Sequence, residues 1–438
     1  MILIVGAGLA GLSTAHHLQG IPYRILEKET EAGGLCRSYQ KDGFTFDYTG
    51  HLLHFRQPAI KALVESLLPS RLQQHTRRSY IYSHQTYTEY PFQVNTHGLP
   101  SEVVRECLLG FIETLTKAGE TSPPQPLTFK EWIVASLGEG IAKHFMVPFN
   151  EKLWQVPLDE LTAEWVSWLV PKPDLKDVVN GALGIKDKAF GYNPSFLYPA
   201  QGGIQALPQA FLGSVPGIHY GTELLEVDTQ RRRVVFRHAE HGERSEDYSA
   251  LVSTIPLPEL VRRCTDLPRA VQEAAEKLRW VSVYSVNLGI GRERISDKHW
   301  IYFPERTYPF YRAGFPMNFS PSLGPSGCSS LYVEISHLPH VTGPPSDVIS
   351  LARKGLEHAG ILRSKDEMVV ADVKNIPYAY VLFDRHRAHA VPLILSELKR
   401  RGIYSIGRYG FWEHTSMEDA IGQGRSMAES LRSLQIAA

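Results

Sequence analysis

Cysteine is scarce in this chain, which has four cysteines among 438 residues. Cys36, Cys107, Cys264 and Cys328 lie far apart, and none belongs to a CxxC pair. Such spacing favours neither a disulfide framework nor a zinc site, and it fits a reducing compartment. We therefore expect a cytoplasmic protein without a metal centre.

The chain also lacks an excess of charge and any long apolar run. Its 46 basic residues equal its 46 acidic residues, so no overall field would attract nucleic acid or an anionic membrane. No apolar stretch reaches the length of a membrane span, and the opening MILIVGAG has no basic region ahead of it. These absences predict a protein that neither binds nucleic acid nor inserts into a membrane, and they leave oligomer formation open.

The first motif that is present is a glycine-rich turn between a strand and a helix. Residues 1–5 form an apolar run of strand length, and a short helical pattern follows the turn and ends at Gly20. Within the turn, Gly6 allows a tight bend, Gly8 lets the backbone approach a diphosphate, and Gly11 allows the helix to pack closely on the strand. The N–H groups at the start of that helix would then face the phosphates.

An acidic residue and a second pair of glycines follow this unit. Glu27 ends the next predicted strand, about 20 residues after Gly6, where a carboxylate can accept hydrogen bonds from an adenosine ribose. Up to this point the motif is compatible with both NAD and FAD. Gly33 and Gly34 then offer a second close approach of the backbone, as an extended cofactor requires, and Arg37 follows them. We therefore predict FAD as the cofactor.

This N-terminal segment resembles the FAD-binding segment of glutathione-reductase-like flavoproteins, which include amine oxidases, protoporphyrinogen oxidases, phytoene desaturases and UDP-galactopyranose mutases. The resemblance extends to residues 49–51 and returns at residues 403–431, where a strand, a turn and a helix starting near Met417 are predicted. It implies a cofactor site made of Gly6, Gly8, Gly11, Glu27, Gly33, Gly34, Arg37, Gly50, Gly407, Arg408 and Met417.

The predicted fold class is α/β: a glutathione-reductase-like Rossmann domain for FAD, discontinuous in sequence, with an inserted substrate domain of helices and antiparallel sheet. The chain is longer than one hydrophobic core usually accommodates. We assign residues 1–56, 193–261 and 385–438 to the FAD-binding domain. Residues 57–192 and 262–384 are assigned to the substrate side.

Four further stretches carry a narrower resemblance, to the eukaryotic-type UDP-galactopyranose mutases. They are YPFQ from Tyr90, FMVPFNEKLW ending at Trp154, NPSFLYPAQGG from Asn193, and WIYFPERTYPFYRAGFP, which contains Arg312. An aromatic face and an amide suit a uracil base, and a guanidinium suits a phosphate, although a buried arginine can also form an ion pair between domains. The resemblance implies a substrate site made of Tyr90, Phe92, Gln93, Asn150, Trp154, Asn193, Tyr302, Arg312, Tyr380 and His414.

The activity that this resemblance implies is that of a flavin-dependent mutase. Such enzymes interconvert the pyranose and furanose forms of a nucleotide sugar, here one like UDP-galactose, through an adduct at N5 of reduced FAD. His51, beside the flavin, and Arg312, at the diphosphate, would be the catalytic residues. NADPH or NADH is the candidate reductant, although the sequence contains no second nucleotide fingerprint.

Three positions depart from the family pattern. The position of the family's second phosphate-binding arginine is Leu169, and Lys172 is the nearest cation. A family tyrosine is replaced by His414 and another aromatic residue by His54. Either the diphosphate is held differently in this protein, or the substrate is different.

Two other functions fit parts of the sequence. A flavin oxidoreductase of the amine oxidase or protoporphyrinogen oxidase type would use oxidised FAD and an apolar tunnel, whereas Gln93, Asn150 and Arg312 are polar. Rab GDP-dissociation inhibitors share the fold without using flavin, but the complete glycine motif argues against them. Core packing is also an equally good interpretation for Asn150, Trp154 or Asn193 taken singly.

Overall fold

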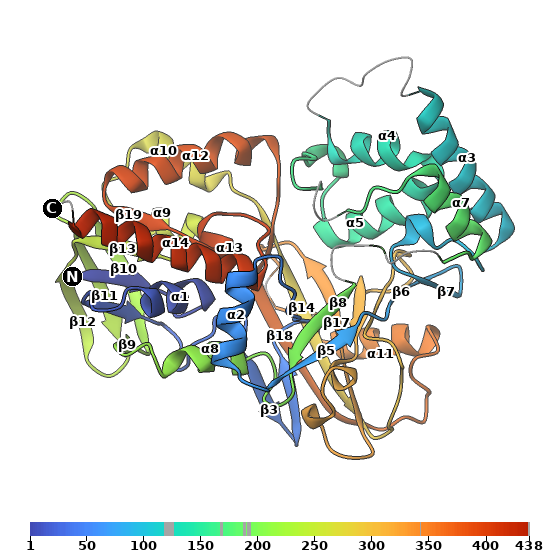
Figure 1. Cartoon of the computed structure of the whole chain (residues 1–438), viewed down its shortest axis with the longest axis horizontal. Helices are drawn as coiled ribbons and strands as arrows, with labels where there is room; N and C mark the ends of the chain where they lie inside the picture. Colours follow the sequence, from blue (N-terminus) through green and yellow to red (C-terminus); the bar gives the residue numbers. More distant parts are fainter. Residues whose placement is uncertain (118–126, 167–169, 187–189, 191–193, 342, 437–438) are drawn as a thin grey trace.

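The computed structural model describes residues 1–117, 127–166, 170–186, 190, 194–341 and 343–436. The first strand, the first helix and the C-terminal helix lie together on one side of the molecule, and a group of helices lies on the opposite side (Figure 1). Among the described residues, none of the helices combines the length and the apolar character that a membrane crossing requires.

The nucleotide-binding side is built on a five-stranded parallel sheet with the order β19-β13-β1-β2-β9. Its central strand β1 is buried at every residue, which explains the continuous apolar run at the start of the chain. The strands are β1 (Ile2–Val5), β2 (Tyr23–Leu26), β9 (Ile218–His219), β13 (Ala250–Ser253) and β19 (Ile403–Ser405). This sheet joins segments from both ends and the middle of the sequence.

Two helices from opposite ends of the chain pack on this sheet side by side. Helix α1 (Leu9–His17) follows β1, and α14 (Met417–Ile436) is the last helix. The Ser13 hydroxyl donates to the Ile421 carbonyl oxygen at 2.6 Å. A Cβ atom at Gly424 would lie 2.5 Å from the Ala10 carbonyl oxygen, so only glycine permits this close approach. The strand, glycine turn and helix predicted at residues 1–20 are confirmed, as is the helix that starts at Met417.

A seven-stranded sheet forms the middle of the molecule, with the order β18-β14-β17-β16-β15-β6-β7. Its pairs are antiparallel except for β6 and β15, which are parallel. The strands are β6 (Ser79–Ser83), β7 (Thr86–Glu89), β14 (Trp280–Ile290), β15 (Trp300–Tyr302), β16 (Arg312–Gly314), β17 (Ser329–His337) and β18 (Met368–Val381). The predicted α/β fold class, with an antiparallel sheet beside the Rossmann-like sheet, is confirmed.

The remaining strands form smaller sheets. They pair β3 (Ser38–Lys41) with β4 (Phe44–Asp47), β5 (Leu72–Thr76) with β8 (Ser195–Pro199), and β11 (Arg233–His238) with both β10 (Thr222–Asp228) and β12 (Gly242–Asp247).

The helical group consists of α3 (Ser101–Lys117), α4 (Phe129–Ile141), α5 (Val147–Trp154) and α7 (Leu175–Leu183). A π-helical turn at Ala142–Met146 joins α4 to α5. A Cβ atom at Gly140 would overlap the backbone of Glu106, so α3 and α4 are in backbone contact. The remaining helices are α2 (Pro58–Leu67), α8 (Ala206–Leu212), α9 (Leu257–Arg263), α10 (Arg269–Glu276), α11 (Val348–His358), α12 (Arg385–Arg400) and α13 (Gly407–Gly410).

Candidate active site

The turn after β1 has the geometry that its glycines predict. Gly6 has φ +97°, and a Cβ atom there would overlap the Thr254 hydroxyl. A Cβ atom at Gly11 would overlap the Gly6 carbonyl oxygen, so α1 rests directly on the turn. Side chains at either position would push the helix away from the strand.

Gly8 and the second glycine pair form a backbone cradle at the start of α1. Gly8 is the N-cap of α1, and no side chain caps its N–H groups. Gly8 also forms an isolated bridge with Gly33, and a Cβ atom at Gly8 would lie 4.0 Å from the Gly34 Cα. The protein itself therefore leaves room for a side chain at Gly8. Uncapped N–H donors beside that space fit the diphosphate of a dinucleotide.

Glu27 lies at the end of β2 and is buried. Its Oε2 accepts the Ala7 N–H at 2.6 Å, and its Oε1 accepts the Glu29 N–H at 2.9 Å. A carboxylate oxygen can accept more than one hydrogen bond, so both oxygens keep capacity for ribose hydroxyls. Glu27 thus also holds the glycine turn against β2.

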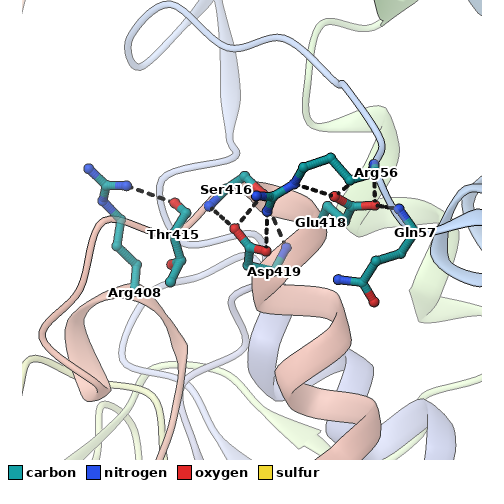
Figure 2. Close-up of polar contacts among 7 residues, drawn as sticks. All are labelled: Arg56, Gln57, Arg408, Thr415, Ser416, Glu418 and Asp419. Carbon is teal, nitrogen blue, oxygen red and sulfur yellow. Dashed lines mark hydrogen bonds and ion pairs between the residues drawn. The ribbon is translucent and has the colours of Figure 1, made fainter. Parts of the chain in front are cut away.

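Two arginines of the expected cofactor site make local contacts. Arg37 donates through Nε to the Gly34 carbonyl oxygen at 2.9 Å. Arg408, next to Gly407 in α13, donates through Nη1 to the Thr415 carbonyl oxygen at 2.7 Å (Figure 2). Each arginine therefore stabilises a turn that belongs to the expected flavin site.

The start of α14 is tied to the loop before α2. Ser416 and Asp419 cap the helix reciprocally, with the Ser416 N–H donating to Asp419 at 2.9 Å and the Asp419 N–H donating to the Ser416 hydroxyl at 3.2 Å. The buried Glu418 carboxylate accepts the N–H groups of Arg56, at 2.8 Å, and of Gln57, at 2.6 Å (Figure 2). Met417 therefore begins a firmly anchored helix.

Gly50 and the neighbouring His51 lie close to β17, an inner strand of the seven-stranded sheet. A Cβ atom at Gly50 would overlap the Tyr332 hydroxyl. The His51 Nδ1 atom lies 3.1 Å from the Thr49 carbonyl oxygen, so the Nδ1–H tautomer donates there and leaves Nε2 as an acceptor. Burial lowers the pKa of His51 and outweighs the nearby Asp47 carboxylate, so the ring is neutral at pH 7.

A cavity of about 190 Å³ separates the helical group from the sheet. It is lined by eight of the ten expected substrate residues: Tyr90, Gln93, Asn150, Trp154, Tyr302, Arg312, Tyr380 and His414. Phe92 does not line it, because its buried ring stacks on Phe145 in the core at 5.1 Å. Asn193 lies outside the described residues, as does Leu169. Lys172 is exposed and does not line the cavity.

Aromatic rings form one wall of the cavity. His414 stacks on Trp165 with ring centroids 5.6 Å apart and lies edge-on to Trp154 at 5.3 Å. Its Nε2 lies 2.9 Å from the Val381 carbonyl oxygen, to which it donates. Burial and the charge of Arg408 hold the pKa of His414 well below its usual value, so it is neutral. His414 also lines a larger, open groove of about 700 Å³ along α14.

The two side-chain amides that line the cavity both form hydrogen bonds within the protein. The Asn150 amide nitrogen donates to the Met146 carbonyl oxygen at 2.7 Å, and its oxygen accepts the Trp154 indole N–H at 3.0 Å. Asn150 therefore also has a structural role within its helix. The Gln93 amide nitrogen donates to the Pro171 carbonyl oxygen at 2.7 Å, which directs the plane of this amide.

Arg312 is held by a carboxylate on the neighbouring strand. Its Nε donates to Glu334 Oε2 at 2.8 Å, and its Nη2 donates to Glu334 Oε1 at 2.6 Å. Burial opposes charge on both groups. The ion pair prevails, however, raising the pKa of Arg312 and lowering that of Glu334, so both stay ionised. The Nη1–Nη2 edge of the guanidinium remains available for a phosphate.

Sequence reasoning missed three residues of this region: Trp165, Glu334 and Glu418. Glu334 lies in the run SSLYVEISH, where it is the single acidic residue, and a lone carboxylate in a buried strand signals a cationic partner. That signal was present in the sequence, but it does not identify the partner. Trp165 and Glu418 are recognised only through their contacts.

A parallel sheet, a glycine turn leading into an uncapped helix, a buried carboxylate after β2 and a second glycine pair together define a dinucleotide-binding flavoprotein. The chain belongs to the flavin containing amine oxidoreductase family, which it matches over residues 9–432. FAD, the predicted cofactor, fits both this family and the glycine cradle.

Comparison with solved structures shows which flavoproteins this chain resembles. The chain is 27% identical to reduced UDP-galactopyranose mutase, with a TM-score of 0.92 over 99% of this chain and 95% of that one. A putrescine oxidase variant (14% identity, TM-score 0.66, 99% and 98% covered) and a fatty acid isomerase from P. acnes (14%, 0.64, 98% of both) share the fold. The protein is a flavoprotein of the amine oxidase superfamily that resembles UDP-galactopyranose mutase.

Proposed function

We propose that this protein is a flavin-dependent mutase that interconverts the pyranose and furanose forms of a nucleotide sugar like UDP-galactose. The observation that carries the proposal is the cavity in which eight of the ten expected substrate residues meet. Its arginine is linked through Glu334 to Gly50, in the loop expected beside the flavin. The likeness to a solved mutase supports the same assignment.

In this proposal Arg312 binds the diphosphate through its free Nη1–Nη2 edge and stabilises the departing nucleotide. Tyr302 and Tyr380 line the same cavity and offer hydroxyl donors. Tyr90 and Gln93 face the base, with an aromatic ring for stacking and an amide for hydrogen bonds. We also assign the substrate side to 57–192 and 262–384, and the flavin side to the rest of the chain.

When bound, reduced FAD supplies a nucleophilic ring nitrogen, and NADPH or NADH is the proposed reductant. His51 contributes a neutral ring whose Nε2 accepts a hydrogen bond. The rings of Trp154, Trp165 and His414 keep water away from the sugar. The cavity is smaller than most ligand sites, so we expect the helical group to move away from the sheet when a nucleotide sugar enters.

The decisive experiment is product analysis with UDP-galactofuranose, using protein whose flavin is oxidised in one sample and reduced with dithionite in the other. We expect conversion to the pyranose form only in the reduced sample, and NADPH and NADH are then tested as replacements for dithionite. A reducible flavin without conversion would contradict the proposed substrate and turn the search to other nucleotide sugars.

A first variant tests the role of Arg312. We expect Arg312→Ala to keep its flavin and to bind UDP more weakly by about 2–5 kcal/mol, because a desolvated phosphate loses its charged partner. Arg292→Ala is the control, since Arg292 forms the same type of two-bond pair with Asp366 and does not line the cavity. Isothermal titration with UDP measures both, and equal affinity in the Arg312 variant would refute the assignment.

A second candidate is a FAD-dependent oxidoreductase of the amine oxidase or protoporphyrinogen oxidase type. The family match and the aromatic wall of the cavity favour it. It predicts hydrogen peroxide from the oxidised protein with an amine or a reduced porphyrin ring, and no dependence on dithionite. The same two samples therefore separate the two candidates.

A further inference from the structure

Arg312 and Glu334 lie directly opposite each other on β16 and β17. The Glu334 side chain is 1% exposed and the Arg312 side chain 18% exposed, so the pair is buried on the carboxylate side and open on the guanidinium side. Two hydrogen bonds, of 2.8 and 2.6 Å, fix the guanidinium plane. Because the carboxylate accepts hydrogen bonds along the Nε–Nη2 edge, the other edge of the guanidinium faces away from β17.

Glu334 also reaches the loop on the expected flavin side. Its Oε1 accepts the Gly50 N–H at 3.3 Å. Tyr332, two residues earlier on the same strand, abuts Gly50, and its ring centre lies 5.9 Å from the Arg312 guanidinium carbon. One carboxylate therefore contacts both the cavity arginine and the backbone next to His51.

The charge of the cavity depends on this pair. Among the described residues that line the cavity, Arg312 is the single charged side chain, and His414 is neutral. Glu334 lies behind Arg312 and offsets its charge, so Arg312 adds little net charge to the cavity before a ligand binds. At short range in a dry site, a bare guanidinium would attract an anion far more strongly than a paired one.

We propose that Glu334 is a positioning residue that orients Arg312 and sets the effective charge felt by the phosphate and by the flavin. Its carboxylate weakens the attraction of the site for anions, which allows the cleaved nucleotide to be released or recaptured rather than trapped. It also keeps the bound flavin harder to reduce than an unpaired Arg312 would. The part concerning phosphate rests on the proposed function, whereas the part concerning the flavin does not.

The test is a double-mutant cycle of Glu334→Gln and Arg312→Gln in the flavin-loaded protein. The amide of Glu334→Gln keeps the shape and can still accept hydrogen bonds, but it removes the charge. We expect this variant to bind UDP about tenfold more tightly with unchanged affinity for uridine. We also expect its flavin midpoint potential to rise by ~30 mV, the equivalent of a tenfold shift for two electrons. Both effects should vanish when Arg312 is already Gln, because burial then favours the protonated, uncharged Glu334 and the substitution removes no charge.

Asp366→Asn is the matched control, because it neutralises the carboxylate of a two-bond arginine pair remote from the cavity. It should change neither the UDP affinity nor the potential. An unchanged potential in Glu334→Gln, or effects that persist in the Arg312→Gln background, would overturn the inference.

Two further outcomes also decide the question. If the unaltered protein binds neither UDP nor uridine, the proposal of a nucleotide substrate is wrong. The flavin midpoint potential then tests the role of Glu334 by itself. If Glu334→Gln does not fold but the double variant does, Glu334 serves only to neutralise a buried cation, and the inference that it tunes binding and potential is wrong.

Discussion

At the scale of single residues, a buried charge in this protein is held by partners from distant parts of the chain. Lys152 of α5 is an example outside the cavity. Its Nζ donates to the carbonyl oxygens of Phe303 at 2.6 Å and Glu305 at 2.8 Å, so it fastens the helix that carries Asn150 and Trp154 to the segment before Arg312. Burial lowers the pKa of Lys152 to about 7, despite the opposing effect of Glu305.

This pKa predicts how stability changes with pH. The folded pKa of about 7 lies below the unfolded value of 10.5, so the unfolded chain binds more protons between these values. The free energy of unfolding should therefore gain up to about 1.4 kcal/mol per pH unit from Lys152 as pH rises from 7 towards 10. Urea titrations at several pH values should show a flatter pH dependence for Lys152→Met than for the unaltered protein. Lys130→Met, which changes an exposed lysine, is the control, and a slope unchanged by Lys152→Met would contradict the assignment.

Site residues that belong to a sequence motif were predictable. Residues whose role depends on contacts with distant segments were not. The place of Arg312 among aromatic residues indicated a special role, but its partner lies 22 residues away and is selected by strand register. The structure brings Tyr90 and Gln93 of the YPFQ motif to one cavity, whereas Phe92 points into the core because a 3-10 turn begins there. Sequence spacing does not reveal that rotation.

At the scale of elements, the glycines at the start of α1 have two separate tasks. Gly11 serves the fold, because any side chain there would overlap the Gly6 carbonyl oxygen. Gly8 has ordinary φ and open space around it, so the protein itself does not require glycine at that position. The binding of a ligand diphosphate therefore stays the predicted reason for glycine at this position.

We predict that Gly8→Ala folds normally without flavin but fails to bind it, because the added methyl group occupies the space of the diphosphate. Gly11→Ala should instead destabilise the apoprotein itself by about 2 kcal/mol or more, through overpacking against backbone. Gly213→Ala is the control, since Gly213 has helical φ and no neighbour within 4 Å. Thermal melting of the apoprotein and flavin absorbance after reconstitution measure the two effects. A yellow Gly8→Ala protein would refute the placement of the cofactor.

Elements formed by local sequence were predictable, and those formed by remote pairing were not. The strand, turn and helix of residues 1–20 follow from spacing and glycine chemistry alone. By contrast, β6 pairs in parallel with β15, more than two hundred residues later in the chain, by the register Ser79↔Trp300. Pairing between segments so far apart in the chain is costly in loop-closure entropy, and it leaves no periodic pattern in the sequence of either segment.

At the scale of the whole molecule, both large sheets combine strands from the two halves of the chain. In the five-stranded sheet, β1 and β2 come from the N-terminal half, and β13 and β19 from the C-terminal half. In the seven-stranded sheet, β6 and β7 come from the first half and the other five strands from the second. The division into flavin and substrate domains stays a prediction, as do the cytoplasmic location and the oligomeric state.

This interleaving predicts the behaviour of a split protein. Glu240 and His241 form an exposed turn between β11 and β12, where a chain break should be tolerated. We expect fragments 1–240 and 241–438 to be aggregated or unfolded when expressed separately, because β1 then lacks its neighbour β13 and β6 lacks β15. Co-expression should restore a soluble complex that co-purifies with flavin, as judged by size-exclusion chromatography and absorbance. If fragment 1–240 bound flavin alone, the N-terminal glycine motif would be sufficient as an independent unit, and the dependence on the distant strands and on α14 would be wrong.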